Sequence, residues 1–119
     1  MGVTISATVQ TPIEWTLSQM GSQALLPGTQ ITLEVQAGKL SGFAGCNNYT
    51  GSYTATQNPD GSYAVTVTGV TGTGMACPED IMQQEQTYLS MLGAVIAGGI
   101  QGSTLNLNSP QGMLSYYQP

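Results

Sequence analysis

The sequence predicts an α+β fold in which a curled antiparallel sheet of about seven short strands, an incomplete barrel, packs around one amphipathic helix. Three observations lead to this expectation. Short segments alternate apolar and polar residues, as strands with one buried face do. Turn-forming residues separate neighbouring segments closely enough for hairpins, which implies antiparallel pairing. Only one stretch has helical apolar spacing, and a single helix cannot cover both faces of a wide flat sheet, so the sheet is expected to curl.

Five strands are expected in the first half of the chain. They are residues 13–17, 31–35, 39–44, 49–56 and 63–68. Ala37-Gly38 has the chemistry of a tight turn, and residues 58–61 (Asn-Pro-Asp-Gly) combine a fixed φ, a side-chain cap and a left-handed position. Gly45-Cys46-Asn47-Asn48 interrupts the alternation, and because Gly and Asn tolerate positive φ, a bulge or sharp corner is expected there.

The helix is expected to begin at Pro78 and to end at Gly98-Gly99, about five turns later. Glu79 and Asp80 lie where the helix dipole favours anions. The apolar face is expected to consist of Ile81, Tyr88, Leu92 and Val95, widened by Leu89, Met91 and Ile96, with Gln83, Gln84, Glu85 and Gln86 facing solvent. Two closing strands, residues 104–107 and 113–117, are joined by a hairpin loop at residues 108–112.

Residues 1–11 are interpreted as a linker or loosely attached N-terminal extension, with a first edge strand as the alternative, and residues 12–119 as one domain. No signal peptide is visible at the start of the sequence. We expect that a targeting segment has been removed and that Met1-Gly2 is left from expression. A cytosolic protein that never had such a segment is the alternative.

Composition excludes several classes of function. Among 119 residues there are six carboxylates, one Lys (Lys39), no Arg and no His, for a net charge of −5. Clustered cations are required to bind nucleic acid or anionic membranes, so neither partner is expected. No transmembrane segment is expected, because the longest apolar stretch (residues 91–100) is too short. Without His the commonest metal ligand is missing, and we expect no metal and no cofactor.

The two cysteines, Cys46 and Cys77, are expected to form one disulfide between two loops. They form no CxxC motif, and no further Cys or His completes a zinc site. Two unrelated buried thiols are the alternative, which stays open at this point. A disulfide implies an oxidising compartment, so the expected location is the periplasm, an outer-membrane-anchored position or the outside of the cell.

No catalytic motif emerges, and we expect the protein not to be an enzyme. The adjacent pair Glu79-Asp80 points in different directions on a helix and is better explained by dipole complementation. Lys39 lies beside a hairpin turn, where a solvated charge is expected. Asn48-Tyr49-Thr50 matches a glycosylation sequon, a match that often arises by chance.

Aromatic and amide side chains suggest where a partner would bind. Trp15 is favoured as a core anchor whose indole N–H is hydrogen-bonded, with a place on a binding surface as the alternative. The strand tyrosines are either cross-strand contacts or part of an exposed surface, and both readings stay open. The candidate interaction surface consists of Trp15, Asn47, Asn48, Tyr49 and Tyr53.

Three segments together resemble the META domain, or HslJ-like, family. They are Ile13-Glu14-Trp15-Thr16-Leu17, the run from Leu40 through Gly45-Cys46-Asn47-Asn48-Tyr49-Thr50-Gly51-Ser52-Tyr53, and Thr73-Gly74-Met75-Ala76-Cys77. The resemblance covers residues 13–117, and the run G-C-N-x-Y-x-G-x-Y with a later M-A-C is specific. Two features depart from the family pattern, namely Gly74 before Met75 and the near absence of charge.

The resemblance implies a curled antiparallel sheet with a packed helix, in a small bacterial envelope protein that is often a lipoprotein, so a lipid anchor in the full-length protein fits. Family members are associated with stress responses, and no catalytic residues are established that could be transferred. The main functional hypothesis is a non-enzymatic binding module for a protein or peptide, with peptidase inhibition as its sharper form. The alternative is a carrier of a lipid or small hydrophobic ligand in an apolar cavity. A hydrolase that uses Ser or a carboxylate pair, with Glu79 and Asp80 as the pair to test, is a third hypothesis. The sequence predicts neither the ligand nor the oligomeric state.

Overall fold

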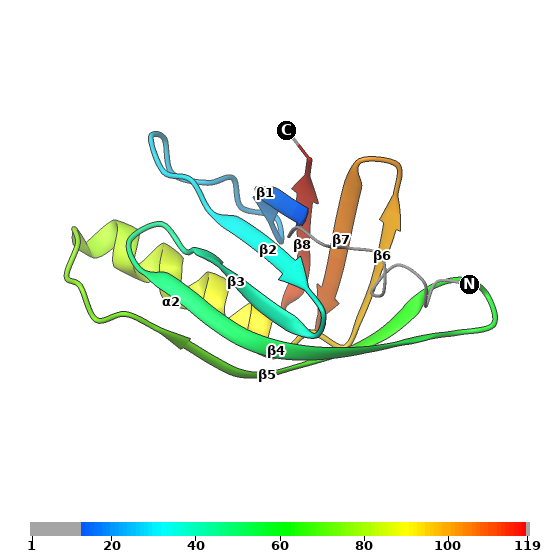
Figure 1. Cartoon of the computed structure of the whole chain (residues 1–119). Helices are drawn as coiled ribbons and strands as arrows, with labels where there is room; N and C mark the ends of the chain where they lie inside the picture. Colours follow the sequence, from blue (N-terminus) through cyan, green and yellow to red (C-terminus); the bar gives the residue numbers. More distant parts are fainter. Residues whose placement is uncertain (1–12, 119) are drawn as a thin grey trace.

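The computed structural model describes residues 13–118, which form an antiparallel barrel with one helix (Figure 1). The elements are β1 (Ile13–Met20), β2 (Thr32–Gln36), β3 (Lys39–Phe43), β4 (Asn48–Gln57), β5 (Tyr63–Gly72), α2 (Glu79–Gly93), β6 (Ala97–Gln101), β7 (Thr104–Ser109) and β8 (Gly112–Tyr117). Each strand pairs with the next, and β8 pairs with β1. The predicted α+β fold is therefore confirmed, and within residues 13–118 the barrel has eight strands and is closed, where about seven and an incomplete closure were expected.

The additional strand arises where the helix was expected to continue. Helix α2 ends at Gly93, and the glycines expected to stop it at 98 and 99 belong to β6. A Cβ atom on Gly98 would lie 2.9 Å from Leu107 Cδ2 and 3.1 Å from the Asn106 carbonyl oxygen. Gly98 is therefore a close-packing residue inside the sheet, a role that the isolated sequence does not distinguish from a helix C-terminus. Val95, expected on the helix, is buried just beyond it.

Strand β1 continues past the expected end at Leu17 because it contains a bulge. Leu17 pairs with Tyr116 and Gln19 with Ser115, so β1 contributes one more residue than β8. The extra residue returns Met20 to the inner side of the barrel, where both Leu17 and Met20 are buried.

Side chains fill the interior of the barrel. The largest fully buried ones are Tyr49, Tyr88, Tyr116, Leu17, Ile31, Leu33, Leu92, Leu114 and Asn47. Helix α2 supplies Tyr88, Met91 and Leu92 to this core, and it lies inside the curve of the sheet (Figure 1), where its main strand neighbours are β5, β7 and β8. The pairing of β5 with β6 is the shortest, with Tyr63 opposite Gly98 and Ala64 opposite Ala97.

Three buried tyrosines form a chain of hydrogen bonds through the core. The Tyr49 hydroxyl donates to the Thr32 carbonyl oxygen at 2.7 Å and lies 2.7 Å from the Tyr88 hydroxyl, which lies 2.9 Å from that of Tyr116. Because Tyr49 uses its only proton on Thr32, Tyr88 donates to Tyr49 and Tyr116 donates to Tyr88. The chain joins β2, β4, α2 and β8 and gives every hydroxyl in it a partner.

Gly42 creates the space in which this chain reaches Thr32. A Cβ atom at this position would lie 2.2 Å from the Thr32 carbonyl oxygen and 3.0 Å from the Tyr49 hydroxyl. The obstructing atoms are backbone, which cannot move without separating β2 from β3. Any other residue at this position therefore forces the backbone of β2 and β3 apart.

We expect Gly42→Ala to lower the free energy of unfolding by about 3 kcal/mol, because the added methyl group overpacks the core against backbone atoms. Gly99→Ala is the matched control, since a Cβ on this β6 glycine meets no atom within 4 Å. Urea unfolding of both variants measures the difference. Equal stability of the two variants would contradict the role assigned to Gly42.

Stability should fall as pH rises above about 10. Burial raises the pKa of Tyr49, Tyr88 and Tyr116 above the ordinary tyrosine value of 10.0. Above that pH the unfolded chain loses these protons while the folded chain keeps them, so ionisation stabilises only the unfolded state. Each tyrosine contributes a loss of up to about 1.4 kcal/mol per pH unit. Urea midpoints across this range measure it, and Tyr88→Phe should show a shallower decline; a flat profile would refute the prediction.

Candidate functional site

A corner of the barrel near the start of α2 brings together the residues that the sequence singles out. It consists of residues 43–48, which connect β3 to β4, and residues 73–77, which connect β5 to α2, and we call it the clamped corner. A turn brings the Ala44 N–H to 2.8 Å from the Asn47 carbonyl oxygen, and Gly45 adopts a φ of 104°. The expected sharp turn at Gly45-Cys46-Asn47-Asn48 is thus confirmed.

Asn47 holds the two connections of the clamped corner together. Its Oδ1 accepts hydrogen bonds from the Met75 N–H and the Thr73 hydroxyl, both at 2.7 Å. Its Nδ2 donates to the Met75 carbonyl oxygen at 3.2 Å and to Glu85 Oε2 at 2.8 Å. The side-chain amide therefore uses all its main donors and acceptors, and it fixes the backbone of residues 73–75 as a neighbouring strand would.

Glu85 anchors the same corner from inside the helix. Its carboxylate accepts from the N–H groups of Cys46 at 3.1 Å and Asn47 at 2.8 Å, in addition to the Asn47 amide. Only 5% of Glu85 is exposed, so the expectation that it faces solvent is wrong. Three donors replace the water that this carboxylate gives up on burial.

Gln84, also expected to face solvent, is buried as well. Its Oε1 accepts from the Leu26 N–H at 2.7 Å, and its Nε2 donates to the Thr29 hydroxyl oxygen at 3.1 Å. The first turns of α2 therefore hold the β1–β2 connection on one side and the clamped corner on the other.

The Cys46–Cys77 disulfide closes the clamped corner covalently. The two Cα atoms lie 6.1 Å apart and are 31 residues apart in sequence. The predicted pairing is confirmed, and among the described residues no cysteine is free. On the chain-entropy account, a loop of this length stabilises the fold by about 3–4 kcal/mol.

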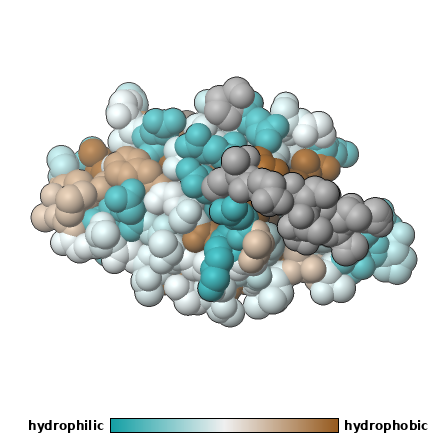
Figure 2. Space-filling view, viewed as in Figure 1, coloured by the Kyte–Doolittle hydropathy of each residue, from teal (hydrophilic) through white to brown (hydrophobic). Residues whose placement is uncertain are grey.

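Apolar side chains emerge on this rigid backbone. Met75 is 55% exposed and Phe43 is 37% exposed, and Asn48 is exposed beside Phe43, its partner in the β3–β4 pairing. Figure 2 shows hydrophobic surface at the end of the molecule that carries the β5–α2 connection. The clamped corner thus presents apolar groups whose backbone is already ordered.

The candidate surface predicted from the sequence is only partly exposed. Trp15, Asn47 and Tyr49 are buried, which corrects their assignment to a surface. For Trp15 the favoured reading as a core anchor is confirmed; Tyr49 also belongs to the core, and the Asn47 amide is fully hydrogen-bonded within the clamped corner. Asn48 is exposed, and Tyr53 is half-buried. These last two lie on opposite faces of β4, because their separation in the strand is odd.

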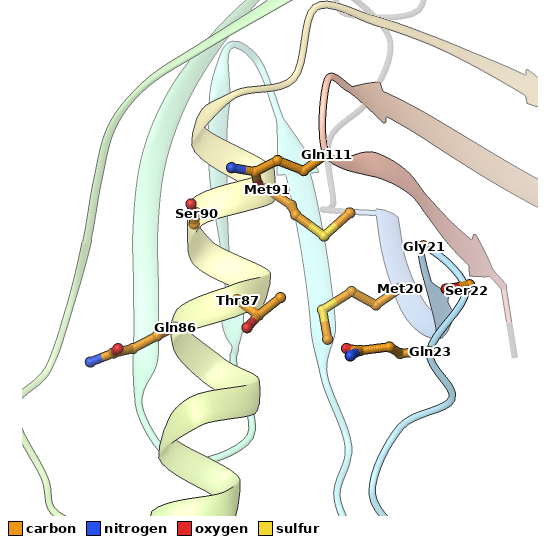
Figure 3. A pocket seen from close by; sticks show the side chains of 9 residues that line it. All are labelled: Met20, Gly21, Ser22, Gln23, Gln86, Thr87, Ser90, Met91 and Gln111. Carbon is orange, nitrogen blue, oxygen red and sulfur yellow. The ribbon is translucent and has the colours of Figure 1, made fainter.

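A shallow pocket of about 480 Å³ lies between α2 and the loop after β1 (Figure 3). Met20 and Met91 point into it from opposite sides, and its remaining side chains are glutamines, serines and a threonine. A second pocket, of about 620 Å³, lies beside β1 and Tyr117. No ionisable carboxylate or amine lines either one, so each can offer hydrogen bonds to a neutral group but no acid–base pair.

The candidate catalytic residues do not converge. Glu79 and Asp80 are exposed at the start of α2, where Asp80 Oδ1 accepts from the Ile81 N–H at 2.8 Å. Lys39 is exposed and donates to the Ser52 hydroxyl oxygen at 3.4 Å. Within residues 13–118 no group of three His, Cys, Asp or Glu side chains could hold a metal ion. No helix in this part of the chain is long and apolar enough to cross a membrane.

Glu85 and Gln84 are the site residues that sequence reasoning missed. The signal was present for Glu85, which precedes Tyr88 by three residues and Leu92 by seven and so shares their helix face. Glu85 lies within a run of four polar residues, 83–86, which hides the helical spacing that it shares with Tyr88 and Leu92.

These features define a class of protein: a small disulfide-bonded antiparallel β-barrel module that carries one helix against its core. The family model of the META domain matches residues 7–118, and the chain belongs to this family. A protein from Burkholderia xenovorans solved by NMR is similar in structure, with a TM-score of 0.68 and 28% identity over 90% of this chain and 81% of that chain. A second NMR structure shares the fold at a TM-score of 0.64 and 16% identity, covering 89% and 88% of the two chains. No curated protein matches significantly.

Glu85→Gln should lower the free energy of unfolding by about 2–3 kcal/mol, because the new amide nitrogen cannot accept a hydrogen bond and leaves a buried donor unpaired. Glu79→Gln, which removes an exposed carboxylate from the same helix, should cost about 0.5 kcal/mol. Urea unfolding of the oxidised proteins measures both. If Glu79→Gln were the more harmful substitution, the anchoring role of Glu85 would be refuted.

Proposed function

We propose that the protein is a non-enzymatic binding module whose partner is a protein or peptide, and that the clamped corner is the surface that contacts it. The observation that carries the proposal is the combination of exposed apolar side chains with a fixed backbone: Met75 is held through both its N–H and its carbonyl by Asn47.

A fixed backbone favours binding for an entropic reason. Ordering a flexible loop on association costs free energy, which a loop already held in place does not lose. Here the Cys46–Cys77 disulfide and the Glu85 carboxylate have fixed the corner before any partner arrives. Methionine adds an adaptable apolar contact, which suits a protein surface better than a shaped small-molecule site.

The proposed location is the periplasm, the outer membrane surface or the outside of the cell. The disulfide supports this proposal, because such bonds form and persist in oxidising compartments and are rare in the cytosol. A role in stress responses fits the family but has no support from the geometry.

The absence of enzymatic activity is proposed from the residue inventory and its placement. The chain has no His, and its Glu79-Asp80 pair is exposed at the start of a helix. Both carboxylate oxygens of Glu85 accept hydrogen bonds from Cys46 and Asn47. Acid–base catalysis requires titratable groups placed together in a cleft.

The filled interior weighs against the carrier hypothesis. Eight large apolar or aromatic side chains that are almost fully buried occupy the inside of the barrel, and both pockets open at the surface. A protein partner on the clamped corner requires no cavity.

The proposal predicts that Met75→Asp abolishes capture of a partner from the envelope fraction of the native host, because a charge would be placed in an apolar contact. Ile96→Asp is the matched control, since Ile96 is 62% exposed, is also apolar and lies outside the clamped corner. Photo-crosslinking under oxidising conditions, read by mass spectrometry, measures capture.

Capture by the native protein and by Ile96→Asp, with loss in Met75→Asp, is the expected result. Equal capture by both variants would refute the corner as the contact surface, and no specific crosslink to the native protein would refute the binding function. A panel of peptidases tests the sharper form, peptidase inhibition, and inactivity against all of them would exclude it.

A further inference from the structure

The far half of β4 carries an open strand edge. Strand β3 pairs with β4 only as far as Lys39 opposite Ser52, and the last hydrogen bond runs from the Tyr53 N–H to the Gly38 carbonyl oxygen at 3.0 Å. Residues 54–57 continue as a two-stranded arm with β5, which extends past β3 in Figure 1. Within residues 13–118 no strand pairs with the other side of this arm segment, and we call residues 54–57 of β4 the open edge.

Backbone groups of the open edge point toward a missing strand. The Tyr53 N–H faces β3, so the N–H groups of Ala55 and Gln57, two and four residues on, face the same side. A second observation agrees: Val65, opposite Ala55, directs its N–H away from β4 to the Ile96 carbonyl oxygen at 3.1 Å. Ala55 and Val65 therefore form a non-hydrogen-bonded pair, and the N–H and carbonyl groups of Ala55 point away from β5.

The open edge is short, but within its four residues it carries no charge, proline or bulge. Natural edges are protected by charges, prolines, bulges or very short length. Residues 54–57 read Thr-Ala-Thr-Gln, all exposed and all uncharged, and the register shift of the β4–β5 pairing lies earlier, between Thr50 and Ser52. The inner face beside the edge is apolar: Tyr53 and Val65 are half-buried there, and Ile100 on β6 is 59% exposed.

We propose that the open edge receives an extended segment of the partner protein, which adds a strand in line with β3 and hydrogen-bonds to Ala55 and Gln57. This inference rests on the proposed binding function and adds a second contact with the same partner, at the opposite end of β4 from the clamped corner. The segment would alternate apolar and small polar residues, because alternate side chains would meet the apolar inner face. It would carry a basic residue toward the arm tip, where Asp60 is fully exposed and held by the N–H and hydroxyl of Ser62 at 3.0 and 2.7 Å.

A second copy of this chain fits the edge less well. From Ser52 backwards the same side of β4 is occupied by β3, so two copies could pair over only four residues each. A dimer held by this contact alone would bury far less than the roughly 1,200 Å² of a stable interface, whereas a partner that also contacts the clamped corner is not limited to the edge. Each copy also carries a net charge of −5, which opposes close approach and favours a cationic partner.

The test uses the whole oxidised protein and, as probe, a synthetic peptide of about six alternating threonines and valines that ends in lysine. We expect the amide signals of Ala55 and Gln57 to shift in NMR spectra and their hydrogen exchange to slow when the probe is added. Ala55→Pro should weaken binding at least tenfold, because it removes one donor of the edge without touching the β4–β5 hydrogen bonds. Ala55→Ser, which keeps the N–H, should bind as the native protein does.

A second variant guards against loss of folding in Ala55→Pro. Thr56→Lys keeps every backbone donor and adds a charge on the edge, and it should also weaken binding of the lysine-bearing probe. The absence of any probe-dependent change at Ala55 and Gln57, or equal binding by Ala55→Pro and Ala55→Ser, would overturn the proposal. Protection of both amides in the monomer without probe would also overturn it and would assign the edge to the chain's own N-terminal residues. Protection that rises with protein concentration would overturn it in favour of a second copy. Crosslinks at Met75 combined with an unaffected β4 would overturn this mode and leave the proposed function standing.

Discussion

A single buried carboxylate, that of Glu85, holds the start of α2 against the clamped corner, and the fold depends on this contact. Glu85 lies inside the fold with almost no contact with water, and it accepts from two consecutive backbone N–H groups and from the amide of Asn47. A carboxylate in this position is stable only while its donors are in place, because an unpaired buried charge is far more costly than an unmade surface contact. The β3–β4 corner and the helix are therefore linked through Glu85, and the β5–α2 connection joins them through Asn47.

The disulfide and the tyrosine chain extend this arrangement in two directions. Cys77 ties the residue before the helix to the corner that Glu85 holds, so the helix start is fixed covalently and by hydrogen bonds at the same place. One helical turn further on, Tyr88 connects the helix to β4 and β8 through the core. Polar contacts at both levels orient α2, while the apolar side chains around them supply the burial that stabilises the fold.

Much of this architecture could be predicted from the sequence, and the failures have identifiable causes. Strand alternation and turn chemistry gave the hairpins, and cysteine usage gave the disulfide, because these signals are local or depend on composition. The end of α2 was misplaced because Gly98 and Gly99 resemble a helix stop, whereas packing against Leu107 is what requires glycine at 98. Trp15, Asn47 and Tyr49 were assigned to a surface because aromatic and amide residues serve both interfaces and interiors, and only the closed barrel decides between them. The interpretation of residues 1–11 as a linker falls outside the described residues.

The short pairing of β5 with β6 is the weakest closure of the barrel. Two residue pairs close the ring there, whereas the β4–β5 pairing runs along most of both strands. Because local opening is easiest where the fewest contacts must break, we expect the β5–β6 pairing to open before any other pairing of the ring. If this pairing opened, the eight strands would remain one continuous sheet with β5 and β6 at its two ends, and β5 would still be held against α2. The barrel thus combines a covalently closed end, at the Cys46–Cys77 disulfide, with a weakly closed pairing between β5 and β6.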